Sequence, residues 1–178
     1  MVRTVRVAVS CCNHARRFVF SLAHCICTLV PRIDELNAPY VTGNLLMPLL
    51  DGRKALIIED DRVSIDVLKR LLDHVSMEAM VILHSFDILS ELLTVPRPDV
   101  IFLDLEMPVV NGYAVLRMIQ TMPIFQDVPV VAYTTHTSHM NMAAAAGFHS
   151  FLGKPLDSAR FTDQLMRILN NEPVWEVP

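Results

Sequence analysis

The stretch PDVIFLDLEMPVVNG (residues 98–112) joins a short apolar run to an acidic residue and a turn. Residues 100–103 are apolar without interruption, which is typical of a strand buried on both faces of a parallel sheet. Asp104 follows directly, and the proline and glycine of the next residues indicate a loop. The stretch therefore predicts a buried strand that carries a carboxylate at its carboxyl end.

The same pattern recurs on both sides of this stretch. Further strands are predicted from apolar runs at 55–59, 79–83, 128–133 and 149–152. Helices are predicted between and after them at 63–72, 86–93, 112–121, 138–146 and 158–170. Strands that alternate with helices predict βαβ units and a parallel sheet covered on both faces. We expect an α/β fold: a five-stranded, doubly wound parallel sheet of order 2-1-3-4-5, flanked by five helices, in the flavodoxin-like arrangement.

Composition and charge divide the chain into two unequal parts. Of the 178 residues, 52% are hydrophobic and 19% are charged, which excludes an intrinsically disordered chain. The net charge of -4 argues against a nucleic-acid binder held by phosphate contacts. Residues 1–52 hold all four cysteines and carry five arginines against three acids, whereas residues 53–178 carry ten basic and sixteen acidic side chains. We therefore predict an N-terminal extension (1–52), one domain (53–171) and a C-terminal tail (172–178).

The extension contains an apolar run at 18–30, preceded by two arginines. This run is too short for a membrane-spanning helix, which needs about 20 apolar residues. An export signal, a peripheral amphipathic anchor, a Cys/His metal site and a poorly ordered or partly helical segment remain alternatives. The CC and CxC spacings differ from the CxxC spacing of structural zinc sites. We favour the poorly ordered segment, in which case translation could begin at Met47.

Polar residues follow the predicted strands at the points where those strands end. Glu59 and Asp60 follow the first strand, Asp104 the third, Thr134 the fourth and Lys154 the fifth. The carboxyl ends of parallel strands meet at one edge of a sheet, so these side chains should lie close together. Clustered carboxylates repel one another unless a proton or a cation neutralises them, and Mg²⁺ prefers oxygen ligands. The set suits phosphoryl transfer, with an aspartate able to act as the nucleophile.

Four stretches carry a resemblance to a known family. They are ALIIEDD (55–61), PDVIFLDLEMPVVNG (98–112), VPVVAYTT (128–135) and AGFHSFLGKPL (146–156). In this order and spacing they resemble the receiver (CheY-like) domain of two-component response regulators, over about residues 54–171.

The resemblance implies roles for individual residues. Asp104 matches the phosphoacceptor, with Thr134 and Lys154 as its catalytic partners. Glu59, Asp60, Asp104 and the backbone carbonyl of Glu106 match the ligands of a Mg²⁺ cofactor. Phe151 matches an aromatic switch position that acts with Thr134, and the Lys154-Pro155 peptide bond should be cis.

The resemblance also implies a phosphoacceptor switch in the cytoplasm rather than a turnover enzyme. A histidine kinase or a phosphotransfer protein would supply the phosphoryl group, and a downstream protein would read the signal. The sequence after the last predicted helix is short, so we expect output by protein contact, with no direct nucleic-acid binding. A homodimer through the face of the fourth helix, fifth strand and fifth helix is a further expectation.

Three rivals remain from other classes. A haloacid-dehalogenase-like phosphatase also uses a strand-end Asp with an acid two residues later, as in Asp104 and Glu106, but it places its metal-binding acids after the nucleophile. A constitutive pseudo-receiver would lack phosphorylation residues, which are present here. A flavodoxin-like redox protein needs a phosphate-binding loop where this chain has EDDR (59–62). The apolar tail residues Val174, Trp175 and Val177 are expected to pack on the domain's own helices or to meet a partner.

Overall fold

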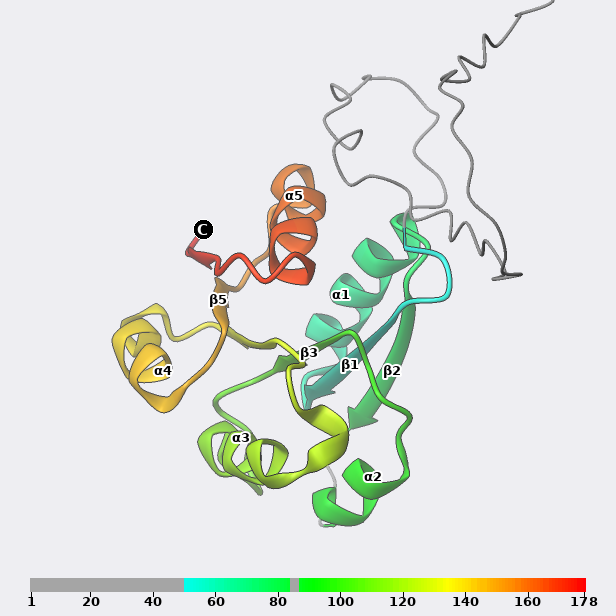
Figure 1. Cartoon of the computed structure of the whole chain (residues 1–178). Helices are drawn as coiled ribbons and strands as arrows, with labels where there is room; N and C mark the ends of the chain where they lie inside the picture. Colours follow the sequence, from blue (N-terminus) through cyan, green and yellow to red (C-terminus); the bar gives the residue numbers. More distant parts are fainter. Residues whose placement is uncertain (1–49, 84–86) are drawn as a thin grey trace, which may run out of the picture. The chain divides into compact units, whose positions relative to one another are not determined.

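The computed structural model describes residues 50–83 and 87–178. Its strands form one parallel sheet of order β2-β1-β3-β4-β5-β6 (Figure 1). The strands are β1 (Lys54–Glu59), β2 (Glu78–Leu83), β3 (Val100–Leu103), β4 (Val130–Thr134), β5 (Ser150–Gly153) and β6 (Trp175–Glu176). The predicted doubly wound order 2-1-3-4-5 is therefore confirmed, and a sixth short strand extends it.

Helices connect the strands as predicted. They are α1 (Arg62–His74), α2 (Ile88–Thr94), α3 (Gly112–Thr121), α4 (Met140–Ala146) and α5 (Ser158–Leu169). Two short 3-10 helices, Pro123–Phe125 and Thr137–His139, were not predicted. The second explains why α4 starts at Met140 rather than at residue 138. β4 starts after Pro129, because Val128 still closes a turn by donating its N–H to the carbonyl of Phe125 (3.1 Å).

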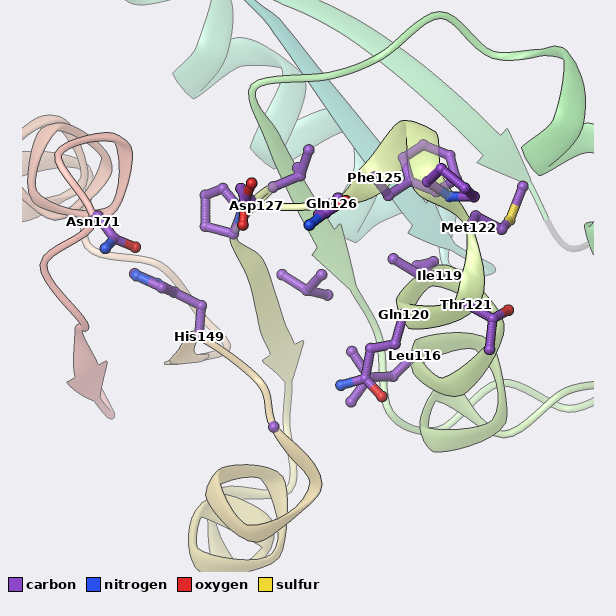
Figure 2. A pocket seen from close by; sticks show the side chains of 15 residues that line it. Leu116, Ile119, Gln120, Thr121, Met122, Phe125, Gln126, Asp127, His149 and Asn171 are labelled. Atoms are coloured by element: carbon purple, nitrogen blue, oxygen red, sulfur yellow. The ribbon is translucent and has the colours of Figure 1, made fainter.

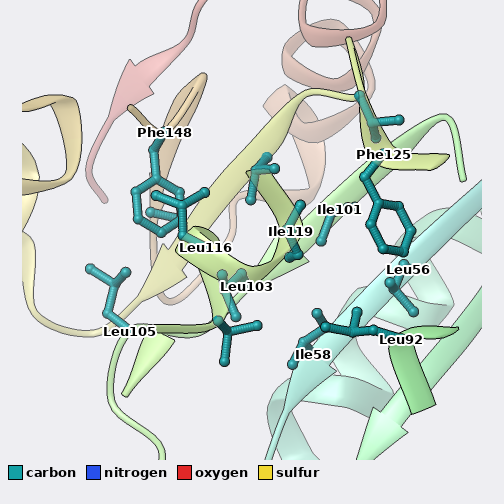
Figure 3. Packing of buried hydrophobic residues seen from close by; sticks show 14 of the residues in the cluster. Leu56, Ile58, Leu92, Ile101, Leu103, Leu105, Leu116, Ile119, Phe125 and Phe148 are labelled. Carbon is teal, nitrogen blue, oxygen red and sulfur yellow. The ribbon is translucent and has the colours of Figure 1, made fainter. Parts of the chain in front are cut away.

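The sheet is covered on both faces, and its core is accordingly in two layers. Alternate residues of β1 point to opposite layers: Ala55 and Ile57 pack with α1 and α5, whereas Leu56 and Ile58 pack with α2, α3 and α4. Figure 3 shows the second layer, with residues of β1 and β3 facing α2 and α3. Strands buried on both faces have no polar face, which is why they read as continuous apolar runs in the sequence.

The folded core begins ahead of the predicted domain start at residue 53. Leu50 is 2% exposed and packs in the layer formed with α1 and α5. The predictions for the extension fall almost entirely on residues 1–49, which lie outside the described residues, so they stay predictions. Among the described residues, no helix has both the length and the apolar character needed to cross a membrane.

The predicted tail forms the sixth strand. We predicted that Val174, Trp175 and Val177 pack on the domain's own helices or meet a partner; Val174 does pack with α5 in one core layer, and the segment also pairs with β5 through its backbone. Val174 is buried, and Trp175 packs against the layer of α2, α3 and α4. The physical reason is that β5 would otherwise present an unpaired row of backbone N–H and C=O groups at the sheet edge.

Candidate functional site

Three carboxylates meet at the carboxyl edge of the sheet. Glu59 ends β1, Asp60 follows it, and Asp104 follows β3, which is the neighbouring strand. One carboxylate oxygen from each lies within 4.8 Å of the others. Glu59 is fully buried, Asp104 is 7% exposed and Asp60 is half-buried. The parallel strands thus bring together the acids that the sequence placed at separate strand ends.

Lys154 places one positive charge among these acids. Its Nζ lies 2.5 Å from Glu59 Oε2 and 3.3 Å from Asp104 Oδ2. The same ammonium lies over the ring of Tyr133, 4.6 Å from the centroid, which adds a cation–π contact. Its backbone N–H donates to the carbonyl of Thr134 (2.9 Å), and the predicted cis peptide bond to Pro155 is confirmed.

The environment of Glu59 favours its neutral form. Burial is the largest cause that raises the pKa of this carboxyl, the charge of Asp104 also raises it, and the hydrogen bond from Lys154 lowers it; the net pKa is about 7. Even with Glu59 neutral, the single ammonium of Lys154 faces the two further carboxylates of Asp60 and Asp104, so the cluster keeps an excess of negative charge. Closely spaced, hard oxygen donors with excess negative charge fit a divalent cation such as Mg²⁺.

The loop after β3 is built to hold Asp104 in place. The N–H of Gly112 donates to the carbonyl of Leu105 (3.1 Å), which folds the loop back on itself. A Cβ at Gly112 would lie 2.1 Å from the Asp104 carbonyl oxygen, so any other residue would force the loop apart. Asn111 then caps α3 by accepting from the N–H of Tyr113 (2.8 Å). The Asn-Gly pair of this stretch is therefore explained by the geometry of the loop.

Glu106 and His136 connect the loops after β3 and β4. The backbone N–H of Glu106 donates to Asp104 Oδ1 (3.4 Å), and its carboxylate lies 3.0 Å from His136 Nδ1. The N–H of His136 donates in turn to the hydroxyl of Thr134 (3.3 Å). Sequence reasoning did not find this contact between Glu106 and His136, because the two residues lie far apart in the chain and nothing in their local pattern marks it.

Asp61 serves the helix rather than the acidic cluster. Its carboxylate accepts from the backbone N–H groups of Val63 (3.2 Å) and Ser64 (3.0 Å) at the start of α1. It also accepts from the Ser64 hydroxyl (2.7 Å), and this bond is the largest cause that lowers the pKa of Asp61. Of the three consecutive acids at 59–61, the third is therefore the N-cap of α1.

Two predicted residues lie beside the cluster rather than within it. Thr134 ends β4 and is fully buried, next to Gly153 of β5. Phe151 is buried in β5, where its ring stacks on Trp175. Tyr133, which the sequence did not single out, lies under Lys154; burial raises the pKa of its hydroxyl, so it stays neutral there.

A cleft of about 480 Å³ opens beside the cluster, and its lining includes Asp60, Glu106 and Asn111. A second cavity, of about 490 Å³, lies near the amino ends of β4 and β5. Figure 2 shows Gln120 of α3 on one side of it and His149 and Asn171 on the other. None of the predicted site residues lines this second cavity, so the first cleft is the one that reaches the acids.

Comparison with known proteins agrees with this geometry. A family model described as the response regulator receiver domain matches residues 55–166. Stress response regulator protein 1 of Lodderomyces elongisporus is 32% identical over 117 residues, which cover 64% of this chain and 32% of that protein. Its counterpart in Meyerozyma guilliermondii is 28% identical, over 62% of this chain and 53% of that protein. The chain thus spans about a third to a half of these two relatives.

Solved structures show the same fold. CheY4, a chemotaxis response regulator of Vibrio cholerae, has a TM-score of 0.58 at 23% identity and is matched over 98% of its length and 65% of this chain. The receiver domain of the sensor histidine kinase PA1611 of Pseudomonas aeruginosa, solved with a magnesium ion in its active-site cleft, has a TM-score of 0.60 at 24% identity, over 98% of its length and 67% of this chain. The family model spans more than half of the chain, and the sheet order and the acids at its carboxyl edge agree with it. This chain belongs to the response regulator receiver domain family.

Proposed function

We propose that the domain is a phosphoacceptor switch of a two-component phosphorelay, with Asp104 as the residue that takes the phosphoryl group. The observation that carries the proposal is the convergence of Glu59, Asp60 and Asp104, with one oxygen of each within 4.8 Å of the others, while the Lys154 ammonium contacts Glu59 and Asp104. Of these acids, Asp104 has a position that suits a nucleophile. It is mostly buried, it follows a central strand, and Gly112 holds its loop.

The reaction needs positioning and charge balance rather than a base. One carboxylate oxygen of Asp104 forms a bond to the incoming phosphorus, and the bond from phosphorus to the donor breaks. The donor is a histidine nitrogen in a kinase or phosphotransfer protein, or an acetate oxygen in acetyl phosphate. The product is an acyl phosphate, which carries more negative charge than the carboxylate it replaces. Lys154 and the Thr134 hydroxyl are then available to donate hydrogen bonds to the new phosphate oxygens.

Glu59, Asp60, Asp104 and the backbone carbonyl of Glu106 are the proposed ligands of Mg²⁺. When bound, the ion would neutralise charge that develops on the transferring group. Without it, Lys154 already forms ion pairs with Glu59 and Asp104, and these keep two like charges together at the edge of the sheet. Glu59 is the ligand whose charge state is most sensitive to the ion, because its surroundings, chiefly burial, raise its pKa to about 7.

The proposed partners and location are supported by family membership. We propose that a histidine kinase or a phosphotransfer protein donates the phosphoryl group, that a downstream protein reads the signal, and that this happens in the cytoplasm. Output by protein contact, without direct nucleic-acid binding, is part of the proposal, as is a homodimer through α4, β5 and α5. Family membership favours this switch over the phosphatase suggested by the spacing of Asp104 and Glu106. In this proposal the domain changes state each time it is phosphorylated and does not turn over a substrate as an enzyme does.

The test is intact-protein mass spectrometry of the full chain after incubation with acetyl phosphate. We expect wild type to gain one phosphoryl group in the presence of Mg²⁺ and none after chelation with EDTA. Asp104→Asn should gain none in either condition. Asp66→Asn is a matched control, since Asp66 is an exposed acid on α1, and it should label as wild type does. Full labelling of Asp104→Asn, or steady release of phosphate from a phosphomonoester, would refute the proposal.

A further inference from the structure

The segment Val174–Pro178 is attached along the outer edge of β5. β6 runs parallel to β5, with Trp175 opposite Phe151 and Glu176 opposite Leu152. The N–H of Phe151 donates to the carbonyl of Val174 (2.7 Å). The N–H of Val174 donates to the hydroxyl of Ser150 (3.0 Å), which is itself fully buried. The backbone of the segment is therefore tied to the strand that leads to Lys154.

On one face of the sheet, the segment covers the aromatic side chain of β5. The rings of Trp175 and Phe151 stack with 6.4 Å between centroids and 15° between planes. Phe151 has no exposed surface, and Trp175 is half-buried above the edge. Any movement of the Phe151 ring within the core must therefore change the surroundings of Trp175, because protein interiors are close-packed.

On the other face, Glu176 is held by α5. Its carboxylate accepts from Gln164 Nε2 (2.8 Å) and Arg167 (3.3 Å) and pairs with Arg160. Gln164 is a polar side chain only 5% exposed, so Glu176 serves as its partner inside the fold.

The end of the segment also fits closely against β5. A Cβ at Gly153 would lie 2.7 Å from Pro178 Cδ, so the absence of a side chain at Gly153 makes room for it. Gly153 directly precedes Lys154, and it pairs with Thr134 in the sheet. Lys154 and Thr134, the two residues proposed to bind the phosphate, are thus direct neighbours of Gly153, the last residue of β5, to which the segment is attached.

We propose that Val174–Pro178 is a strap that restrains the switch: it binds the β5 edge in the unphosphorylated domain and loosens when Asp104 is phosphorylated. This inference rests on the proposed function. In the structure, Lys154 is bonded to Glu59 and Asp104, and new phosphate oxygens compete for that ammonium and for Thr134. A shift at these two residues displaces the end of β5, to which the strap is fastened. The domain therefore has two states, one with the strap bound to the β5 edge and one with the strap loosened.

Coupling of this kind is reciprocal. If phosphorylation loosens the strap, then loosening the strap must favour binding of a phosphoryl group or its mimic. Glu176→Ala removes the contacts to α5 and leaves Trp175, the only tryptophan of the chain, as a probe. Glu172→Ala is the matched control, because Glu172 is a nearby exposed acid whose one ion pair, to Arg167, is long at 3.9 Å.

The experiment uses the full chain and two readouts. Quenching of Trp175 fluorescence by acrylamide is measured before and after phosphorylation by acetyl phosphate with Mg²⁺, with labelling followed by mass. The affinity for beryllofluoride, a reversible phosphoryl mimic, is measured for wild type and both variants. We expect stronger quenching after labelling, and tighter mimic binding by Glu176→Ala, by about fivefold at the low end of usual coupling strengths. Glu172→Ala should bind as wild type does.

The two ways of failing are distinguishable. A labelled protein whose Trp175 quenching is unchanged overturns the strap and leaves the phosphoacceptor role standing. Equal mimic affinity in Glu176→Ala and wild type does the same. A wild-type chain that takes no label refutes the phosphoacceptor role, and the strap falls with it.

Discussion

Neutralising Asp104 should stabilise the folded domain when no divalent ion is present. The change is Asp104→Asn, which keeps the shape of the side chain and removes its charge. The folded state then holds two carboxylates of the cluster instead of three beside the Lys154 ammonium. We therefore expect a larger free energy of unfolding for the variant than for wild type in EDTA.

The magnitude follows from the distances. At an effective dielectric constant of about 20, two charges at 4.8 Å interact by about 3.5 kcal/mol, so Glu59 and Asp60 together repel Asp104 by about 7 kcal/mol. The attraction between Asp104 and the Lys154 ammonium at 3.3 Å offsets this repulsion by about 5 kcal/mol. The unscreened difference is about 2 kcal/mol; because Asp60 is half-exposed, solvent screens its share, and the net gain from Asp104→Asn is about 1 kcal/mol or less.

The assay is urea unfolding at pH 8, where Glu59 is charged, in EDTA and again in excess Mg²⁺. The midpoint of Asp104→Asn should lie above that of wild type in EDTA, and Mg²⁺ should stabilise wild type more than the variant. Asp66→Asn on the exposed face of α1 controls for the loss of one negative charge elsewhere and should shift the midpoint little. A variant no more stable than wild type in EDTA would refute the electrostatic reasoning.

Three further outcomes are expected. Without Mg²⁺, the free energy of unfolding should fall as pH rises from 4.5 to about 7, because burial raises the pKa of Glu59 and the folded state keeps a proton that the unfolded state has lost; a stability that rises over this range contradicts the assignment. Lys154→Met should lower the free energy of unfolding at pH 8 by about 1–3 kcal/mol, because it leaves buried carboxylates unpaired. Urea unfolding curves that overlay those of wild type would count against the ion pairs. The ring centroid of Phe161 on α5 lies 6.3 Å from that of Phe102 on β3, so Phe161→Ala should lower the free energy of unfolding by about 3–5 kcal/mol. Leu93→Ala, at an exposed position, should lower it by less than about 0.5 kcal/mol. Equal unfolding midpoints for the two variants would refute the packing of α5 on β3.

Four of the five predicted strands were found from sequence because burial on both faces leaves them largely apolar, whereas the edge strand β2 is apolar although several of its side chains are exposed. Residues 100–103 match β3 without correction. β6 was not predicted, because Trp175–Glu176 is two residues long and has no apolar run. Its position depends on the free edge of β5 and on partners from α5, and neither is a local property of the tail.

The site was predictable to the extent that it depends on strand ends. Glu59, Asp60, Asp104 and Lys154 meet because the sheet is parallel, and a parallel sheet follows from the alternation of strands and helices. The contacts made by Tyr133 and His136 could not be predicted in this way. They depend on side-chain directions at the ends of strands and in loops, which residue spacing does not specify.

Trapping the phosphorylated residue tests the central claim most directly. An acyl phosphate on aspartate is reduced by borohydride to homoserine, and peptide mass mapping then locates the modified position. After treatment of the full chain with acetyl phosphate and Mg²⁺, we predict homoserine at position 104 and nowhere else. Conversion at Asp60 or Glu106, or a labelled protein with Asp104 unchanged, would contradict the account.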